Sequence, residues 1–328
     1  MAKKLERIGI LTSGGDCPGM NAGIRAAVRT GLASGLRVTG IRRGYQGLID
    51  GDVVEMDHRS VAGIISRGGT ILQTARCQPF YEREGREKAA ETCSSEGIDG
   101  LVAFGGDGTF RGAAKLAEET DIRIVGVPGT IDNDIPGADF TVGFDTAINT
   151  AVCAIDRIRD TATSHERLFL VEVMGRDSGF IALYAGIAGG AEEILVPETP
   201  TDVPALAREL ERGKKRGKSS SIVIVAEGDE AGDALEIARQ LAELAPVYDT
   251  RVSVLGHQQR GGSPTAFDRV LASRLCNRAV KELIAGSSDI MVGVRANEVV
   301  TEPISISWEG GRTKLPEDLL ELYRTLAT

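Results

Sequence analysis

The stretch IDGLVAFGGDGTF, residues 98–110, joins an apolar run to a glycine-rich turn and then to a helical pattern. The run IDGLVAF (98–104) has the length and the residue types of a buried strand. A helix is predicted from about Thr109 to Glu119, followed by a second strand, IRIVGVP (122–128). This strand–helix–strand order predicts the parallel βαβ unit of an α/β fold.

The same alternation continues along the chain. Longer helical patterns, such as the one from about Pro18 to Ser34, separate further apolar runs of strand length. These runs are RIGILT (7–12), LRVTGI (36–41), RLFLVEVM (167–174), SIVIVAE (221–227) and RVSVLG (251–256). Because strands covered by helices on both faces read as continuous apolar runs, we expect an α/β fold with largely parallel sheets. A length of 328 residues suits about two domains.

Charge and composition exclude several classes of protein. A net charge of −9 argues against broad nucleic-acid binding. The apolar runs are too short to span a membrane, and the start MAKKLERIGI has no signal-peptide core, so we expect a cytoplasmic protein. The five cysteines are odd in number and have no C-x-x-C spacing, which favours reduced thiols over disulfides or a zinc site.

The glycine-rich turn carries a single carboxylate, Asp107, between Gly106 and Gly108. Glycines let a backbone approach a bulky anion closely, and backbone N–H groups favour its charge. A carboxylate beside an anion is repulsive unless a cation lies between them. The turn therefore predicts a phosphate, a divalent metal and Asp107 as its ligand. The P-loop, G-x-G-x-x-G, H-E-x-x-H and G-x-S-x-G motifs are absent from the sequence.

A second polar segment, PGTIDNDIPG (128–137), follows the strand at 122–128. Asp132 and Asp134 are two residues apart, so they could be two metal ligands, or one ligand and one general base. An Asx-type turn, in which both carboxylates bond the local backbone, explains the pair equally well.

Basic residues occur at strand ends and in adjoining loops. Arginine binds phosphate bidentately and keeps its charge, and His257 and Glu227 could bond the oxygens of a sugar or phosphate. The basic run ERGKKRGKSSS (211–221) is interpreted first as a solvated turn and second as a phosphate-binding rim. The arginines at strand ends are Arg76, Arg167, Arg176, Arg251 and Arg260.

Taken together, these loops closely resemble one family, the ATP-dependent 6-phosphofructokinases. The resemblance covers most of the chain, in order. The matching segments are LTSGGDCPGMNA (11–22), RGGT (67–70), FGGDGT (104–109), PGTIDNDI (128–135), VGFDTA (142–147), AIDRIRDTATSHERLFLVEVMGR (154–176), AGIAGGAE (185–192) and VLGHQQRGGSP (254–264).

The resemblance implies a fold and a reaction. The fold consists of two Rossmann-like lobes, a larger one for ATP and Mg²⁺ (1–142 plus 259–306) and a smaller one for the sugar phosphate (143–258 plus 307–328). The reaction, a step of glycolysis, transfers the γ-phosphoryl group of MgATP to the 1-hydroxyl of D-fructose 6-phosphate and gives fructose 1,6-bisphosphate. The family is cytoplasmic and normally homotetrameric.

The resemblance also implies the roles of individual residues. Asp132 is the proton acceptor, Arg76 and Thr130 assist catalysis, and Asp107 holds Mg²⁺. The ATP-binding residues are Gly14, Arg76, Cys77, Gly106, Asp107, Gly108 and Thr109. The residues for fructose 6-phosphate are Thr130, Ile131, Asp132, Arg167, Met174, Gly175, Arg176, Glu227, Arg251, His257, Gln258, Gln259 and Arg260. In the family, the counterparts of Arg167 and Arg251 reach the sugar phosphate of a neighbouring subunit.

A regulatory site between subunits is also implied, since bacterial members bind ADP or phosphoenolpyruvate through basic residues. The matching positions are Arg25, Arg29, Arg159, Glu192, Arg216 and Lys218. His58 stands where those members carry an arginine, and the run KKRGK does not align residue for residue.

Two alternatives share this scaffold. A pyrophosphate-dependent phosphofructokinase typically carries aspartate where this chain has Gly108 and lysine where it has Gly129, so both glycines favour ATP. A non-catalytic sensor of sugar phosphates or nucleotides would be expected to lack the base, the metal ligand or Arg76, and all three are present.

Overall fold

The computed structural model describes residues 5–165, 167–217, 220–246, 248–311 and 313–326. The chain forms two compact units. Unit 1 comprises residues 1–130, 135–146 and 260–313, and unit 2 comprises residues 131–134, 147–259 and 314–328. Compared with the expected lobes, 131–134 and residue 259 fall in unit 2, while 143–146 and 307–313 fall in unit 1.

The predicted α/β fold is confirmed, and unit 1 is built on one twisted sheet. Among the described residues this sheet has seven strands in the order β11-β10-β5-β4-β1-β2-β3. The central pairs are parallel, whereas β3 and β11 pair antiparallel at the two edges. The strands are β1 (Arg7–Thr12), β2 (Arg37–Ile41), β3 (Val53–Glu55), β4 (Gly100–Gly105), β5 (Arg123–Pro128), β10 (Ile290–Arg295) and β11 (Glu298–Pro303).

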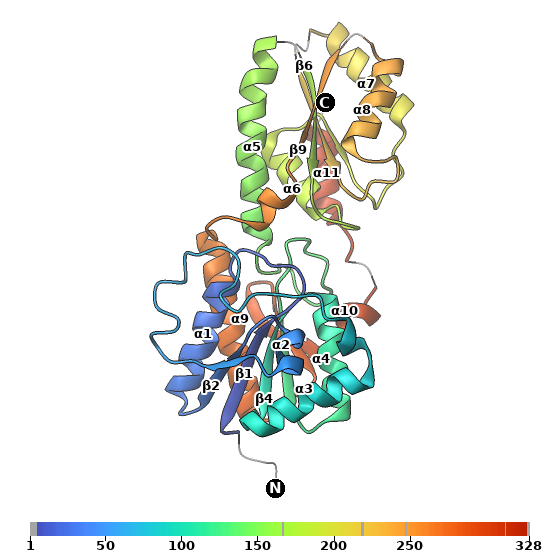
Figure 1. The fold of residues 1–328 in the computed structure, drawn as a ribbon. Helices are drawn as coiled ribbons and strands as arrows, with labels where there is room; N and C mark the ends of the chain where they lie inside the picture. Colours follow the sequence, from blue (N-terminus) through green and yellow to red (C-terminus); the bar gives the residue numbers. More distant parts are fainter. Residues whose placement is uncertain (1–4, 166, 218–219, 247, 312, 327–328) are drawn as a thin grey trace. The chain divides into compact units, whose positions relative to one another are not determined.

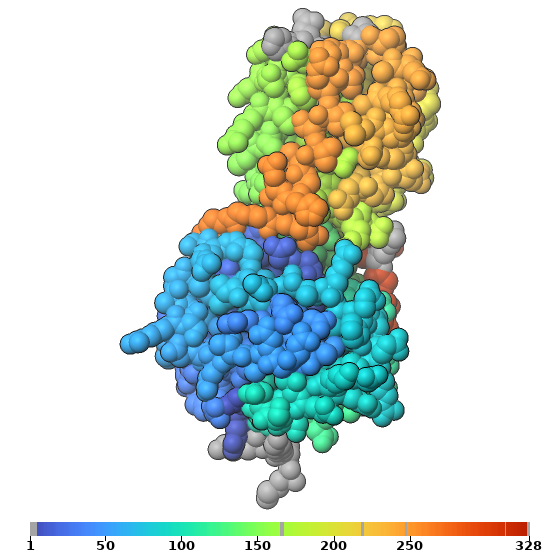
Figure 2. Space-filling model, viewed as in Figure 1, coloured from blue at the N-terminus to red at the C-terminus, as the bar shows by residue number. Residues whose placement is uncertain are grey.

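Helices cover both faces of this sheet, with α1 and α9 on one face and α3 and α4 on the other (Figure 1). This explains why every residue of β1 and of β4 is buried. The helices of unit 1 are α1 (Met20–Ala33), α2 (Tyr45–Asp50), η1 (Gln78–Tyr81), α3 (Arg83–Glu96), α4 (Asp107–Glu119), α9 (Ala266–Ala285) and α10 (Ile306–Glu309). Between β3 and η1, residues 56–77 form turns that lie at the surface of unit 1 (Figure 2).

Unit 2 contains a smaller sheet, in which all pairs between described strands are parallel. Its order is β7-β8-β6-β9, with α7 and α8 on one face and α5 and α6 on the other (Figure 1). The elements are α5 (Phe144–His165), which begins in unit 1, then β6 (Arg167–Val173), α6 (Phe180–Gly189), β7 (Glu193–Leu195), α7 (Val203–Lys215), β8 (Ser221–Ala226), α8 (Ala234–Leu244), β9 (Asp249–Val254), η2 (Gly256–Arg260) and α11 (Glu317–Leu326).

One boundary differs from the prediction in a way that matters for the site. Helix α4 begins at Asp107, two residues before the predicted start at Thr109. Gly106 has an extended backbone and is the N-cap, which places the Asp107 carboxylate in the first helical turn. A negative charge at a helix N-terminus is favourable because the unpaired N–H groups there carry positive partial charge. Asp107 and Gly108 therefore belong to a helix end and not to an irregular loop.

Candidate active site

In unit 1, the loop after β1 and the N-terminus of α4 lie together at the carboxyl ends of neighbouring strands. Ser13 donates its N–H to the carbonyl of Phe104 in β4 at 3.0 Å. Gly14 has a φ of 81°, which favours glycine, and a Cβ there would lie 3.4 Å from the hydroxyl of Thr109. That hydroxyl is buried and has no hydrogen-bond partner among the described residues. Open α/β sheets bind ligands at this edge.

Asp107 presents a carboxylate at the surface of this helix end. Its side chain is 40% exposed and is paired with Arg111, whose Nε lies 2.9 Å from Oδ2. The hydroxyl of Ser307 lies 3.3 Å from Oδ1. Arg111 also lies over the ring of Trp308, 5.2 Å from its centroid. The carboxylate is thus held by the exposed Arg111 and the buried Ser307, and its own exposure leaves it accessible to an added cation.

The two glycines from which ATP is predicted as the phosphoryl donor have different environments. A Cβ on Gly108 would meet nothing within 4 Å, and this glycine does not have a positive φ. A Cβ on Gly129 would lie 2.6 Å from the ring of Phe104. Packing alone therefore requires glycine at 129, whereas neither packing nor backbone geometry requires it at 108.

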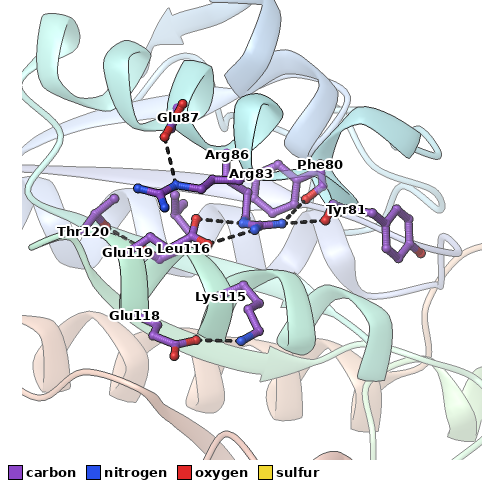
Figure 3. A network of polar contacts seen from close by, with 10 residues as sticks. All are labelled: Phe80, Tyr81, Arg83, Arg86, Glu87, Lys115, Leu116, Glu118, Glu119 and Thr120. Carbon is purple, nitrogen blue, oxygen red and sulfur yellow. Dashed lines mark hydrogen bonds and ion pairs between the residues drawn. The ribbon is translucent and has the colours of Figure 1, made fainter.

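Arg76 and Cys77 precede the short helix η1, which is firmly anchored (Figure 3). Arg86 in α3 donates two hydrogen bonds of 2.8 Å to Glu119 and bonds the carbonyls of Phe80 and Tyr81 at 3.0 and 2.8 Å. Arg76 itself is exposed. Partial burial raises the pKa of the Cys77 thiol. Because Arg76 and Cys77 directly precede η1, the anchoring of η1 fixes the position of their backbone in unit 1.

The anchored segment also reaches α4. The ring of Phe80 stacks on Tyr45 at a centroid distance of 4.0 Å, and the hydroxyl of Tyr45 donates to the carbonyl of Thr109 at 2.5 Å. A Cβ on Gly85 would lie 2.1 Å from the carbonyl oxygen of Pro79, so α3 approaches η1 closely. The segment that carries Arg76 and the N-terminus of α4 are thus joined by one continuous set of contacts.

In unit 2, the loops after β6 and β8 meet at the carboxyl end of the smaller sheet. Arg176 has a φ of 54°, unusual for a residue with a side chain, and its N–H bonds Glu227 Oε1 at 3.0 Å. A Cβ on Gly228 would lie 1.9 Å from the carbonyl oxygen of Arg176, so only glycine allows these two loops to touch. The Glu227 carboxylate is therefore held against the backbone of Arg176, and both residues are exposed.

Asp132 lies in the short segment of unit 2 between Thr130 and Ile135. Its residue is 5% exposed, and its backbone carbonyl accepts a hydrogen bond of 2.8 Å from Ser178, four residues beyond Met174. Asp134, by contrast, is exposed. No group of three or more metal-ligating side chains occurs among the described residues. Asp132 and Asp134 thus have different environments, and Asp132 is packed against the loop that carries Arg176.

Four consecutive predicted residues, His257–Arg260, are the last four residues of the short helix η2, and their surroundings differ. His257 and Gln258 are exposed, whereas Gln259 is completely buried and its Oε1 accepts the N–H of Met174 at 2.8 Å. Gln259 therefore holds the Met174 backbone from within unit 2. Arg260 belongs to unit 1, where its Nη1 donates to the carbonyl of Asp16 at 3.2 Å.

Arg167 lies at the other end of the unit 2 sheet, and Arg251 lies opposite Phe169, two residues further along β6. Both pair with Asp249, at 3.0 and 2.9 Å, on the neighbouring strands β6 and β9. Arg167 begins β6 and Met174 follows it, so about 20 Å of strand separates Arg167 from the loops after β6 and β8. Within one chain, these two arginines are not brought together with Arg176.

The predicted regulatory residues occupy both units. Arg25 and Arg29 are on α1, while Arg159 on α5 donates to the carbonyls of Gly189 and Gly190 at 2.6 and 2.5 Å. Glu192 accepts the N–H of Ile222 at 2.6 Å. Glu192 and Arg216 both line a cavity of about 580 Å³ in unit 2. Lys218 lies outside the described residues.

The first part of the basic run 211–221 is the end of α7, with Arg212, Lys214 and Lys215 in the last turn of the helix. Cations at a helix C-terminus are favoured by the helix dipole. Helix termination thus accounts for Arg212, Lys214 and Lys215, and the phosphate-binding rim stays a prediction.

Comparison with known proteins decides the family. A family model described as phosphofructokinase matches residues 7–283, most of the chain. The chain belongs to the phosphofructokinase family. One curated member, "ATP-dependent 6-phosphofructokinase 1" of Thermus thermophilus, is 57% identical over 323 residues, which cover 98% of this chain and all of that protein.

Solved phosphofructokinase structures share the fold. A chain of phosphofructokinase from Saccharomyces cerevisiae superposes with a TM-score of 0.85 at 36% identity, covering 98% of this chain and 46% of that one. A pyrophosphate-dependent phosphofructokinase from Marinobacter aquaeolei gives a TM-score of 0.86 at 22% identity, covering 99% of this chain and 92% of that one. The second likeness concerns the fold alone. The predicted resemblance to the family is confirmed.

Some residues of this phosphofructokinase that shape the site were not predicted from the sequence. Tyr45, Arg86 and Asp268 act through contacts with residues far away in the chain, such as Thr109, Glu119 and Gly143. None lies in a glycine-rich loop or beside a predicted catalytic residue. The only available signal was the charge of Asp268 within an apolar helical pattern, AFDRVLASRL (266–275).

Proposed function

We propose that this protein is an ATP-dependent 6-phosphofructokinase, which transfers the γ-phosphoryl group of MgATP to the 1-hydroxyl of D-fructose 6-phosphate and gives fructose 1,6-bisphosphate. The observation that carries the proposal is the match, over nearly the whole chain, to the ATP-dependent enzyme of Thermus thermophilus. The reaction is a step of glycolysis, and we propose a cytoplasmic location from its substrates.

Unit 1 supplies the residues proposed for the nucleotide. Gly14, Gly106, Gly108 and Thr109 would lie against the phosphates, and the N–H groups at the start of α4 would face their negative charge. The exposed guanidinium of Arg76, with Cys77 beside it, would neutralise charge on the transferring group. The anchoring of η1 supports this role because it fixes the origin of the Arg76 side chain.

Asp107 is the residue proposed to hold Mg²⁺. Its accessible carboxylate fits this ion, since Mg²⁺ is commonly bound by one or two protein carboxylates together with substrate phosphates and water. The described residues form no cage of three ligating side chains, which agrees with a metal that arrives with the nucleotide. When bound, Mg²⁺ would supply neutralising charge at the phosphates.

Most of the residues proposed for the sugar phosphate belong to unit 2, whereas Thr130 and Arg260 belong to unit 1. Asp132 would take the proton of the 1-hydroxyl, with Thr130 and Ile131 beside it in the chain. The exposed side chains of Arg176 and Glu227, whose loops are joined by the hydrogen bond from the Arg176 N–H to Glu227, would bind sugar or phosphate oxygens. Met174, Gly175, His257, Gln258 and Arg260 are proposed to line the same ligand, while the buried Gln259 supports it through the backbone of Met174.

Arg167 and Arg251 are proposed to serve a neighbouring subunit of a homotetramer. Arg167 lies about 20 Å along β6 from Met174, and Arg251, opposite Phe169, lies about 15 Å along the sheet from it. These distances support the proposal because an arginine side chain cannot cover them within its own subunit. Both guanidinium groups form ion pairs with Asp249, at the start of β9, so the two arginines lie close together.

Arg25, Arg29, Arg159, Glu192, Arg216 and Lys218 are proposed as effector-binding residues. The cavity beside Glu192 and Arg216 supports this for those two positions.

Product identification tests the proposal. Purified protein is incubated with ATP, fructose 6-phosphate and MgCl₂, and the products are followed by ³¹P NMR. We expect ADP and fructose 1,6-bisphosphate to form in equal amounts, and no turnover when EDTA exceeds the metal. ATP hydrolysis without a sugar bisphosphate, or no reaction by a folded protein, would contradict the proposed function.

A further inference from the structure

Asp268 is a completely buried carboxylate in the first turn of α9. Helix α9 lies on the opposite side of the sheet from α4 (Figure 1). Its Oδ1 accepts the N–H of Gly143 at 2.8 Å. Its Oδ2 accepts both the N–H of Thr146 at 2.8 Å and the hydroxyl of Thr146 at 2.5 Å. All three groups are donors, so their arrangement matches an ionised carboxylate and not an amide.

The environment makes this charge costly. Burial raises the pKa of Asp268 above its ordinary 3.8 to about 6, although the hydrogen bonds from Thr146 and Gly143 oppose the shift and Asp145 adds to it. A buried charge that destabilises a fold at neutral pH is a common sign of a functional requirement.

The groups that Asp268 holds belong to the segment that follows β5. Val142, next to Gly143, forms a parallel bridge with Gly129, and its N–H bonds the carbonyl of Pro128 at 3.1 Å. Thr141 donates its hydroxyl to the carbonyl of Thr130 at 2.6 Å. Residues 141–143 therefore hold the backbone of Gly129 and Thr130 in place. Asp268 in turn holds residues 141–143 through its hydrogen bond with Gly143.

Asp268 is also tied to the loop that carries Arg260. Thr265 is the N-cap of α9 and accepts the N–H of Asp268 at 3.3 Å. The N–H of Thr265 bonds the hydroxyl of Thr146 at 3.1 Å. The start of α9, and with it the segment 260–265, is joined to the 141–146 segment through the same carboxylate and hydroxyl.

The loop after β1 packs against this junction as well. A Cβ on Gly19 would lie 2.6 Å from the side chain of Val142 and 3.5 Å from Asp268, and a Cβ on Gly143 would lie 2.6 Å from Cys17. Segments 14–19, 128–143 and 260–265 all carry or adjoin residues proposed for substrate binding. Gly19, Gly143 and Thr265, at the ends of these segments, all lie beside Asp268.

We propose that Asp268 is a positioning residue for phosphoryl transfer, whose carboxylate sets the place of the Gly129–Thr130 backbone through Thr146, Gly143 and the Gly129–Val142 bridge. This inference rests on the proposed function, because it assigns Thr130 to the reacting centre. Asp268 itself touches no substrate in this account. Small displacements of groups around a reacting centre can reduce the rate by about 10²-fold.

The test compares two pairs of variants in the full-length protein. Asp268→Asn keeps the size of the side chain but turns an amide group toward backbone donors. Thr146→Val removes the hydroxyl that bonds Asp268, and Thr146→Ser keeps it. Glu282→Gln, in the last turns of the same helix, is the control for changes in α9 that do not touch the junction.

We expect Asp268→Asn to lower kcat at least about tenfold, with KM for ATP and for fructose 6-phosphate changed less than about threefold. Thr146→Val should lower kcat by several-fold, Thr146→Ser should restore it, and Glu282→Gln should match the wild type. Circular dichroism and urea unfolding establish that each variant is folded.

Three results would overturn the proposal. These are wild-type kcat in folded Asp268→Asn, equal kcat in the Val and Ser variants of Thr146, or a failure of both Asp268→Asn and Thr146→Val to fold, which would assign Asp268 to stability alone. An inactive wild-type protein would instead contradict the proposed function, so the two failures are distinguishable.

Discussion

Replacing Gly108 with aspartate should remove most ATP-dependent activity without harming the fold. Gly108 is exposed in the first turn of α4, and a Cβ there meets nothing within 4 Å. Glycine inside a helix costs roughly 0.5–1 kcal/mol relative to alanine, and an acidic residue near a helix N-terminus gains about 0.3–1 kcal/mol. We therefore expect Gly108→Asp to be as stable as the wild type or slightly more stable.

The loss of activity follows from charge. The start of α4 is where the phosphates of ATP are proposed to lie, beside Asp107. Two like charges about 5 Å apart repel by about 3 kcal/mol at an effective dielectric constant near 20. A penalty of that size on nucleotide binding or on the transition state lowers kcat/KM for ATP by roughly 10²-fold.

A matched variant separates charge from bulk. Gly108→Asn has nearly the same size as Gly108→Asp and no charge, so we expect it to keep kcat/KM for ATP within about tenfold of the wild type. Steady-state assays with varied MgATP, at low and high salt, give both values, and thermal melting reports stability. Activity of Gly108→Asp equal to that of Gly108→Asn would refute the placement of the phosphates at this helix end. The same test is not clean at Gly129, where any side chain collides with Phe104.

Three further predictions follow from the site. Asp132→Asn should lower kcat by about 10²-fold or more in a folded protein, because general base catalysis contributes about 10²–10⁴-fold; near-normal turnover would remove Asp132 from that role. Mixing Asp132→Asn with Arg251→Ala subunits, after dissociation and reassociation, should restore activity through hybrid sites, and confirmed hybrids without activity would argue against a shared site. Because burial raises the pKa of Asp268 to about 6, the stability that its protonated form provides is present below pH 4 and lost as the pH rises through 6. The wild type should therefore lose roughly 2 kcal/mol relative to Asp268→Asn between pH 4 and pH 7, as measured by urea unfolding, and a constant difference would contradict the raised pKa.

Local patterns predicted much of the fold because its strands are short, apolar and buried on both faces. The run RIGILT coincides with β1, and RLFLVEVM exceeds β6 by only one residue. The strand RVSVLG was placed two residues too late, since β9 begins at Asp249. Its residues alternate between exposed and partly buried at the edge of the sheet, where the apolar pattern is weaker. The antiparallel edges β3 and β11 were not predicted, because pairing with a neighbour, and not the local sequence, defines them.

The candidate site was predictable where loops follow strands and carry glycine beside charge. The sequence could not show that Gln259 points inward to Met174, or that Arg167 and Arg251 share Asp249. The sequence also could not show that glycine is required by packing at 129 and not at 108, because this difference depends on the position of the Phe104 ring. Such contacts join residues that are distant in the chain, and no local spacing encodes them.

The central claim is that the protein uses ATP as the phosphoryl donor to fructose 6-phosphate. The most direct measurement is kcat/KM for ATP and for pyrophosphate, each at saturating fructose 6-phosphate and Mg²⁺, on the same purified protein. The account predicts that the value for ATP exceeds that for pyrophosphate by at least roughly 10²-fold, which is about 2.7 kcal/mol of transition-state discrimination. Equal values, or a preference for pyrophosphate, would contradict it.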